Sequence, residues 1–289
     1  MKTNNNLVAL WPKWSYSEIV ANEIIIAESG IITDLITIPS EVTNMVRDIA
    51  GNGFAATLWN LKVIKQIPSS LAWVVPVHNT YWKTVNLAPE AIYQIIKDET
   101  LKSMGWYSLK IVHILACLEW TNLENLKSIH SHPQAISQCT NEWIKRLWKD
   151  IKLVNEQSTT THIQDLKIWE AVICNSTAAK NAGLKILDNS FWPNENTTDF
   201  LILSPYEKIE WLQNLTHEKA MIIMSLINKP WSLVKWLTLL SEAWVNMSSL
   251  HSQTESPWNT DFIVITDNNC DWYSIWKDIK KQWWKIKIL

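Results

Sequence analysis

The chain has 289 residues, an apolar fraction of 47% and a formal net charge of −2, which is enough for one large or two medium domains with hydrophobic cores. The near-neutral charge gives no electrostatic basis for binding nucleic acid or an anionic membrane surface, so we expect neither partner. The first residues lack a basic segment followed by a long apolar run, and the sequence therefore predicts a cytoplasmic protein.

Short apolar runs alternate with amphipathic stretches over the first two thirds of the chain. Helices are expected at 15–27 and 135–147, and Gly183 is placed where a helix would end. The expected strands lie at 7–10, 71–77, 111–115, 184–187 and 200–203. This alternation is typical of an α/β fold in which helices cover a sheet.

A polar stretch at 204–217 separates this region from a smaller C-terminal unit. The pattern predicts strands at 220–227, 245–251, 261–266 and 285–289, with helices at 233–243 and 273–282. A βαββαβ order of this kind is the ferredoxin-like pattern.

Twenty tryptophans accompany only five glycines, whereas ordinary usage of about 7% predicts about 20 glycines in a chain of this length. Several tryptophans occupy positions where a turn favours a residue without a Cβ: Trp11 and Trp14 follow the first strand, and Trp231 and Trp244 bracket a helix. We therefore hypothesise that most of them stand for glycine, through a UGA codon that the organism reads as glycine. The alternative is a genuinely tryptophan-rich chain.

The cysteines and histidines show no pattern typical of a metal site. The four cysteines are scattered without a CxxC pair, and His78, His130 and His162 lack metal-ligand spacing along the chain. The sequence therefore predicts no metal and no redox centre.

Six segments carry motifs once tryptophan is read as glycine. They are LWPKWSYSE (10–18), WVVPVHNTYWKTV (73–85), IHSHPQAISQCTNEW (129–143), QST (157–159), NTTDFLIL (196–203) and SLINKPWSLVKWLTLLSEAWVNM (225–247). In this order the first five resemble prephenate dehydratases, with their GPxGTYS turn, SHPQALAQC segment and TRF motif. The last resembles the NKPGSL helix of the ACT regulatory domain in the same family.

The resemblance implies an α/β architecture with a two-lobed catalytic domain at 1–210, similar to periplasmic solute-binding proteins, and a ferredoxin-like ACT domain at 218–289. It also implies cofactor-free decarboxylating dehydration of prephenate, L-phenylalanine as effector, and a homodimer or homotetramer. Arogenate dehydratase, a catalytically silent amino-acid-binding regulator and a free-standing solute-binding protein remain alternatives.

The reaction removes a ring hydroxyl and a carboxylate, so it needs a donor at the departing hydroxyl and anchors for the substrate carboxylates. The resemblance places Thr198 at the hydroxyl, and His132 is a nearby side chain that titrates near neutral pH. The implied catalytic residues are Thr198, His132, Asn79, Thr80 and Gln134, and the implied substrate contacts are Trp14, Ser15, His78, Ser158, Thr159, Asp199 and Phe200. Taken singly, Thr198 also fits an ordinary strand residue, His132 a helix-entry residue and Ser158 a polar loop.

Two positions depart from the family pattern. Asp199 replaces the arginine of TRF, and His78 replaces the glutamate of ENS. One interpretation is a charge-reversed pair in which His78 contacts Asp199. The others are weakened carboxylate anchoring and a preference for arogenate, whose ammonium group would suit an acid at Asp199.

The effector site implied by the ACT resemblance is only partly retained. The NKPG turn supplies Asn228, Pro230, Trp231, Ser232 and Leu233. The ESRP stretch aligns with His251 and Ser252, and its serine alone survives. A degenerate ACT domain kept for dimerisation is therefore the alternative to a phenylalanine site.

Overall fold

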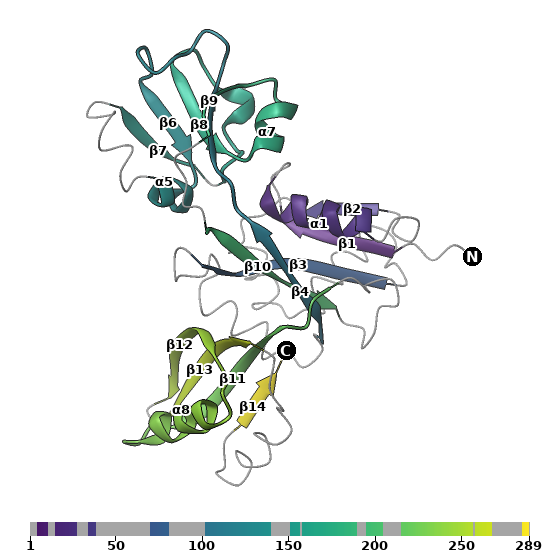
Figure 1. Cartoon of the computed structure of the whole chain (residues 1–289), viewed down its shortest axis with the longest axis vertical. Coiled ribbons are helices and arrows are strands. Elements are labelled where there is room, and N and C mark those ends of the chain that lie inside the picture. The colour runs from purple at the N-terminus through teal and green to yellow at the C-terminus, as the bar shows by residue number, and fades with distance from the viewer. Residues whose placement is uncertain are drawn as a thin grey trace.

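The computed structural model describes residues 5–10, 15–27, 34–38, 70–80, 102–139, 151–156, 158–189, 195–204, 215–256, 258–267 and 285–288. These residues form three β-sheets, which Figure 1 shows as three successive blocks with the first sheet in the middle. The helices of this part of the chain are too short or too polar to cross a membrane.

The first sheet has the strand order β2-β1-β3-β10-β4. Its strands are β1 (Asn5–Leu10), β2 (Asp34–Ile38), β3 (Ser70–Asn79), β4 (Lys102–Lys110) and β10 (Thr197–Ser204). Strands β1, β2 and β3 pair in parallel, whereas β10 runs antiparallel to both β3 and β4. Helix α1 (Tyr16–Ala27) packs on this sheet through one apolar stripe, in which Ile24 lies four residues after Val20 and three after Ala21. This stripe packs against Phe200 and Ile202.

The second sheet has the order β7-β6-β8-β5-β9 and lies at the top of Figure 1. Its strands are β5 (Ile114–Cys117), β6 (Ser128–Ser131), β7 (Lys152–Asn155), β8 (Glu170–Cys174) and β9 (Lys185–Asp188). Both faces are covered: α5 (Pro133–Cys139) buries Ala135 and Ile136 against one core, and α7 (Ser176–Asn181) buries Ala178 and Ala179 against the other. A short 3₁₀ helix, η2 (Ile163–Asp165), adds Ile163 to the second core.

The third sheet has the order β12-β13-β11-β14 and lies at the bottom of Figure 1. Its elements are β11 (Lys219–Ile227), α8 (Ser232–Glu242), β12 (Met247–Ser256), β13 (Asn259–Asp267) and β14 (Lys285–Ile288). Helix α8 buries Trp236 and Leu240 against Met224, Leu226 and Val264. This strand order fits the expected βαββαβ pattern.

The structure confirms the α/β class and most of the expected elements. The strand expected at 111–115 is misplaced: β4 ends at Lys110 and β5 begins at Ile114. Strand β4 was missed because Gly105 and alternate polar residues interrupt its apolar pattern. The helix expected at 273–282, residues 140–147 of another, and the turn residues Trp11 and Trp14 lie outside the described residues.

Every non-glycine residue with a positive φ in the described part of the chain is a tryptophan: Trp169 (72°), Trp231 (73°) and Trp244 (58°). Trp231 is the N-cap of α8, and Trp244 follows its C-cap. The amide of Trp244 donates to the carbonyl of Ser241, and that of Val245 to Leu240, which is the Schellman arrangement that normally has glycine at this place.

Helix α7 ends in the same way with a glycine. The amide of Gly183 donates to Lys180, that of Leu184 donates to Ala179, and Gly183 has a φ of 66°. The expectation that Gly183 ends a helix is confirmed. The chain thus contains one arrangement twice, once with Gly183 and once with Trp244.

Candidate active site

Strands β3 and β10 of the first sheet bring the motifs at 73–85 and 196–203 together. In the antiparallel pairing of β3 with β10, Thr198 lies opposite Asn79, and Asp199 lies opposite His78. All four residues are buried. Because neighbouring residues of a strand point to opposite faces, Asn79 and Thr198 share one face, and His78 and Asp199 share the other.

Asn79 is the centre of a buried hydrogen-bond network between the first two sheets. Its Nδ2 donates to Thr198 Oγ1 at 2.9 Å and to Asn196 Oδ1 at 2.7 Å, and its Oδ1 accepts from Gln138 Nε2 at 3.2 Å. Asn196 Nδ2 donates in turn to Gln138 Oε1 at 2.9 Å. We call Asn79, Gln138, Asn196 and Thr198 the amide network. Buried amides with several partners hold one orientation, since losing a partner leaves a desolvated polar group.

His113 and Tyr16 extend the amide network toward α1. His113 Nε2 lies 2.9 Å from Gln138 Oε1, and its Nδ1 lies 3.1 Å from the Tyr16 hydroxyl, whose oxygen is 2.9 Å from the carbonyl of Val112. Burial lowers the pKa of His113 to about 4 and raises that of Tyr16. Both side chains are therefore neutral at pH 7 and act as fixed hydrogen-bonding groups.

His132 and Gln134 stand where β6 leads into α5. Nδ1 of His132 accepts the backbone N–H of Gln134 at 3.3 Å, which puts the proton of the neutral ring on Nε2. Burial lowers the pKa of His132, so its neutral form predominates at pH 7 and offers one N–H donor. Helix α5 also carries Gln138, so it links this histidine to Asn79.

Asp199 is held by three donors. Its carboxylate accepts from His78 Nδ1 at 3.0 Å, from Ser108 Oγ at 2.6 Å, and from Lys219 Nζ, the first residue of β11. Burial alone would raise the pKa of Asp199, but the bonds from His78, Lys219 and Ser108 hold it below its usual value. The hypothesised contact between His78 and Asp199 is present, and Lys219 of the third sheet adds a cation to it.

Several predicted substrate contacts have their own intramolecular roles. Phe200 is 1% exposed within the core of the first sheet, and both carboxylate oxygens of the fully buried Asp199 are occupied. Both side chains therefore support Thr198 from inside the protein, and their contact with substrate stays a prediction. Ser15 Oγ accepts the amide of Glu18 at the start of α1, while Trp14 lies outside the described residues.

Thr80, Ser158 and Thr159 lie on turns beside these elements. Thr80 is exposed, and its hydroxyl donates to the carbonyl of Glu195 at 2.8 Å, which ties the end of β3 to the residues before β10. Ser158 and Thr159 are half-buried, and Ser158 Oγ accepts the amide of Thr160 at 3.3 Å. No contact joins Ser158 or Thr159 to the amide network among the described residues.

The predicted effector residues surround the start of α8 and the middle of β12. Asn228 donates its amide to the carbonyl of Trp258, Pro230 and Trp231 are exposed, and Ser232 and Leu233 open α8. Ser252 is exposed on β12. Its neighbour His251 has a buried Nε2 with no hydrogen-bond partner among the described residues, and burial, together with the charge of His78, lowers the pKa of His251.

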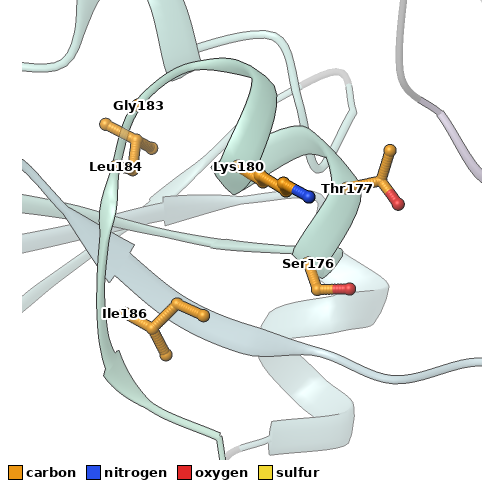
Figure 2. A pocket seen from close by; sticks show the side chains of 6 residues that line it. All are labelled: Ser176, Thr177, Lys180, Gly183, Leu184 and Ile186. Atoms are coloured by element: carbon orange, nitrogen blue, oxygen red, sulfur yellow. The ribbon is translucent and has the colours of Figure 1, made fainter.

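Gln138 and Asn196 lie within two of the sequence motifs, but the motifs alone assign neither residue a role. They are the second glutamine of SHPQAISQC and the asparagine of NTTDF, and the motif match was the signal that could have found them. Ser108, His113 and Lys219 lie in no quoted motif. A separate depression of about 520 Å³ over α7 and β9 contains none of the predicted residues (Figure 2).

The fold and the site together define an α/β protein in which motif-bearing polar residues meet between two sheets. A family model for prephenate dehydratase matches residues 62–208, about half of the chain. The chain belongs to the prephenate dehydratase family.

Individual relatives agree with this assignment. The bifunctional chorismate mutase/prephenate dehydratase of Buchnera aphidicola (Acyrthosiphon pisum strain) is 28% identical over 198 residues, covering 66% of this chain and 49% of that one. The prephenate dehydratase of Methanocaldococcus jannaschii is 27% identical over 195 residues, covering 66% and 68%. The chain thus spans about half the length of the bifunctional relative.

Solved structures show the same fold over most of the chain. A prephenate dehydratase from Staphylococcus aureus superposes with a TM-score of 0.69 at 15% identity, covering 98% of each chain. A prephenate dehydratase from Arthrobacter aurescens in complex with L-Phe gives a TM-score of 0.66 at 18% identity, covering 91% of this chain and 80% of that one.

Proposed function

We propose that the chain is a cytoplasmic prephenate dehydratase that converts prephenate into phenylpyruvate. The observation that carries the proposal is the amide network, in which three family motifs meet at Thr198. In the reaction, one proton joins the departing ring hydroxyl to give water. The carboxylate leaves as CO₂, and the electron pair of its C–C bond completes the aromatic ring.

Thr198 is proposed to donate the hydrogen bond to the departing hydroxyl. Its Oγ1 already accepts from Asn79, so its own O–H is left to point at a substrate. A threonine hydroxyl is too weak an acid to ionise at pH 7, so it transfers a proton only together with the breaking C–O bond. The neutral His132, with its proton on Nε2, is a second donor for the substrate.

The catalytic unit is proposed to be the two-lobed domain at 1–210, with the amide network at the junction of its lobes. The unit at 218–289 is proposed to be an ACT domain that binds L-phenylalanine in a homodimer or homotetramer. The strand order of the third sheet supports this assignment, as does the L-Phe complex of the Arthrobacter aurescens relative.

Most tryptophans are proposed to be glycines in the natural protein. Positive φ favours glycine, and Trp169, Trp231 and Trp244 share it. Trp231 and Trp244 are also 71% and 90% exposed, so their indoles gain little burial in return. Buried Trp236 has an indole N–H without an acceptor among the described residues, which adds a polar cost. Intact-mass measurement of the natural protein distinguishes the two residues.

The decisive assay compares two recombinant forms of the full chain, one with tryptophan and one with glycine at the suspect turn positions Trp11, Trp14, Trp169, Trp231 and Trp244. Phenylpyruvate formation from prephenate by the glycine form is the expected result. A well-folded glycine form without turnover would refute the activity and favour a silent regulator.

Arogenate dehydratase is the remaining candidate because an Arabidopsis thaliana relative, 25% identical over 186 residues, is an arogenate dehydratase/prephenate dehydratase. Asp199 gives no support for an arogenate preference, since its carboxylate is already bound by His78, Ser108 and Lys219. We therefore expect prephenate to be turned over with the higher kcat/KM. The same assay with arogenate measures that ratio.

A further inference from the structure

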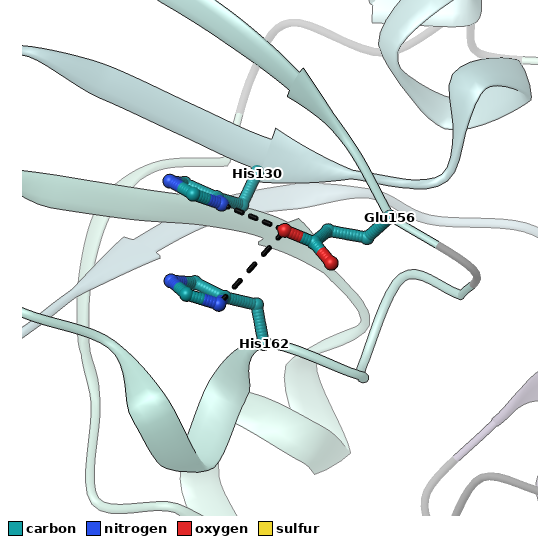
Figure 3. A group of neighbouring side chains, drawn as sticks. All are labelled: His130, Glu156 and His162. Carbon is teal, nitrogen blue, oxygen red and sulfur yellow. Dashed lines mark hydrogen bonds and ion pairs between the residues drawn. The ribbon is translucent and has the colours of Figure 1, made fainter.

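Two histidines and two glutamates converge on one face of the second sheet, outside the amide network. His130 lies on β6, Glu156 follows β7, His162 precedes η2, and Glu170 begins β8. The imidazole rings of His130 and His162 stack with centroids 3.9 Å apart and planes 8° apart. Figure 3 shows Glu156 facing the same edge of both rings. We call these four residues the histidine cluster.

The two edges of the stacked rings have different surroundings. On the Nδ1 edge, Glu156 Oε1 lies 2.9 Å from His130 Nδ1 and 3.9 Å from His162 Nδ1. On the Nε2 edge, Glu170 Oε2 lies 3.0 Å from His162 Nε2, and Ser128 Oγ lies 3.1 Å from His130 Nε2. On the Nε2 edge both rings therefore have a polar neighbour, and on the Nδ1 edge both face one carboxylate oxygen, to which His130 Nδ1 is hydrogen-bonded.

We propose that His130, His162 and Glu156 bind a divalent transition-metal ion of the zinc class on their Nδ1 edge. One ligand atom from each residue lies within 4.8 Å of the other two. A tetrahedral Zn²⁺ with bonds of about 2.0–2.2 Å needs ligand atoms about 3.3 Å apart and lone pairs that converge on it, so binding would replace the proton between His130 and Glu156 and turn the two rings out of their parallel stack. Two imidazoles and one carboxylate are a donor set typical of zinc with a fourth, open position.

The surroundings of the ligands are those of a supported metal site. Ligating histidines usually donate their other N–H to a carboxylate or another acceptor, which fixes the ring, and Glu170 and Ser128 stand where such acceptors belong. Glu170 is itself oriented by the backbone amide of Lys167 at 3.0 Å, and the amide of Glu156 donates to the carbonyl of Ser131 at 2.8 Å. The two glutamates bring a charge of −2 to the cluster, which one divalent cation balances.

A metal ion bound at the histidine cluster would hold Glu156 and His162 against His130 on β6. The segment between Glu156 and His162 carries Ser158 and Thr159, so the metal would hold a turn within the proposed catalytic unit. The expectation of no metal was based on spacing along the chain, whereas here the ligands come from a strand and from two segments outside strands. Metal binding at the histidine cluster does not require the proposed dehydratase activity.

The test measures binding of Zn²⁺ by calorimetry, and of Co²⁺ by its visible absorption, to the chelator-treated full chain. We expect one ion per chain and a higher unfolding temperature with metal. The variants His162→Gln and Glu156→Gln should each lower the affinity at least about 100-fold, and Glu170→Gln about 10–100-fold because it removes only a supporting contact. The exposed His217→Gln is the matched control and should bind as the unchanged chain does.

His162 is a suitable position because its side chain makes no cap bond to η2, so the substitution removes none of the hydrogen bonds of that helix. Circular dichroism of each metal-free variant confirms that it is folded. Two results would overturn the proposal: less than one ion bound per chain, or binding that persists in both His162→Gln and Glu156→Gln. An intense cobalt–thiolate charge-transfer band would likewise overturn it, since it would assign the metal to cysteine.

Discussion

The two equivalent helix ends allow the conformational cost of a tryptophan to be measured inside one molecule. Gly183 and Trp244 occupy the same place in the same hydrogen-bond arrangement, with φ of 66° and 58°. A Cβ added at Gly183 would meet no heavy atom within 4 Å, so Gly183→Ala tests backbone strain without a steric clash. An L-residue in this conformation costs about 1–2 kcal/mol.

We expect Gly183→Ala to lower the free energy of unfolding by about 1 kcal/mol and Trp244→Gly to raise it by about 1 kcal/mol. The gain at Trp244 is not offset by lost burial, because the side chain is 90% exposed. Each change corresponds to a shift in unfolding temperature of about 2–4 °C. Urea unfolding followed by circular dichroism measures both variants.

Two control variants separate backbone strain from loss of an indole. Trp244→Ala keeps a Cβ at positive φ, so it should recover little of the gain. Trp120 is 79% exposed and has no positive φ, so Trp120→Gly should give no gain. A stabilisation by Trp120→Gly equal to that by Trp244→Gly, or a loss of stability in Trp244→Gly, would refute the reasoning.

Three further predictions concern the proposed active site. Thr198→Val should lower kcat by about 10²–10⁴-fold because valine cannot donate a hydrogen bond to the leaving hydroxyl, whereas Thr198→Ser should retain most of the activity. Steady-state phenylpyruvate formation measures both variants, and equal activities of the valine and serine variants would contradict the proposed role. Asp199→Asn should lower the free energy of unfolding by about 3 kcal/mol, since it leaves Lys219 and His78 without the carboxylate that they contact. His78→Asn should lower it by less, because Lys219 still pairs with Asp199. Chemical denaturation of both variants compares the two losses. Burial lowers the pKa of His113 to about 4, whereas an imidazole in an unfolded chain has a pKa of about 6.5. Because the unfolded state takes up a proton between these values and the folded state does not, the free energy of unfolding should fall by up to about 3 kcal/mol as the pH drops from about 6.5 to about 4, with no such fall above about pH 6.5. His113→Asn should flatten that part of the curve of stability against pH.

The sequence predicted the strands that carry the candidate site but not how they pair. Strands β3 and β10 follow from apolar runs at 71–77 and 200–203, and their motifs pointed to Asn79 and Thr198. Their antiparallel pairing joins segments far apart in the chain, and local periodicity contains no information on such partners. The roles of Gln138 and Asn196 depend on that pairing, which is why they could not be assigned from the sequence.

The histidine cluster was not predicted for the same reason, because strand pairing brings its residues together. Spacing along one chain segment detects ligands that share a helix or a turn, as in CxxC. His130 and His162 instead meet because the parallel pairing of β6 with β7 and with β8 aligns the segments around them. A register of this kind is decided by which strand faces are buried, and only the complete sheet shows it.

The two departures from the family pattern explain each other. A carboxylate as buried as Asp199 is stable in its charged form only with partners that replace water. An arginine at position 199 would lie opposite the imidazole of His78 and beside the like charge of Lys219. An acid at position 199 therefore fits a histidine at position 78 and a lysine at position 219. Because Asp199 follows Thr198 directly, this cluster also fixes the end of β10 on which the proposed chemistry depends.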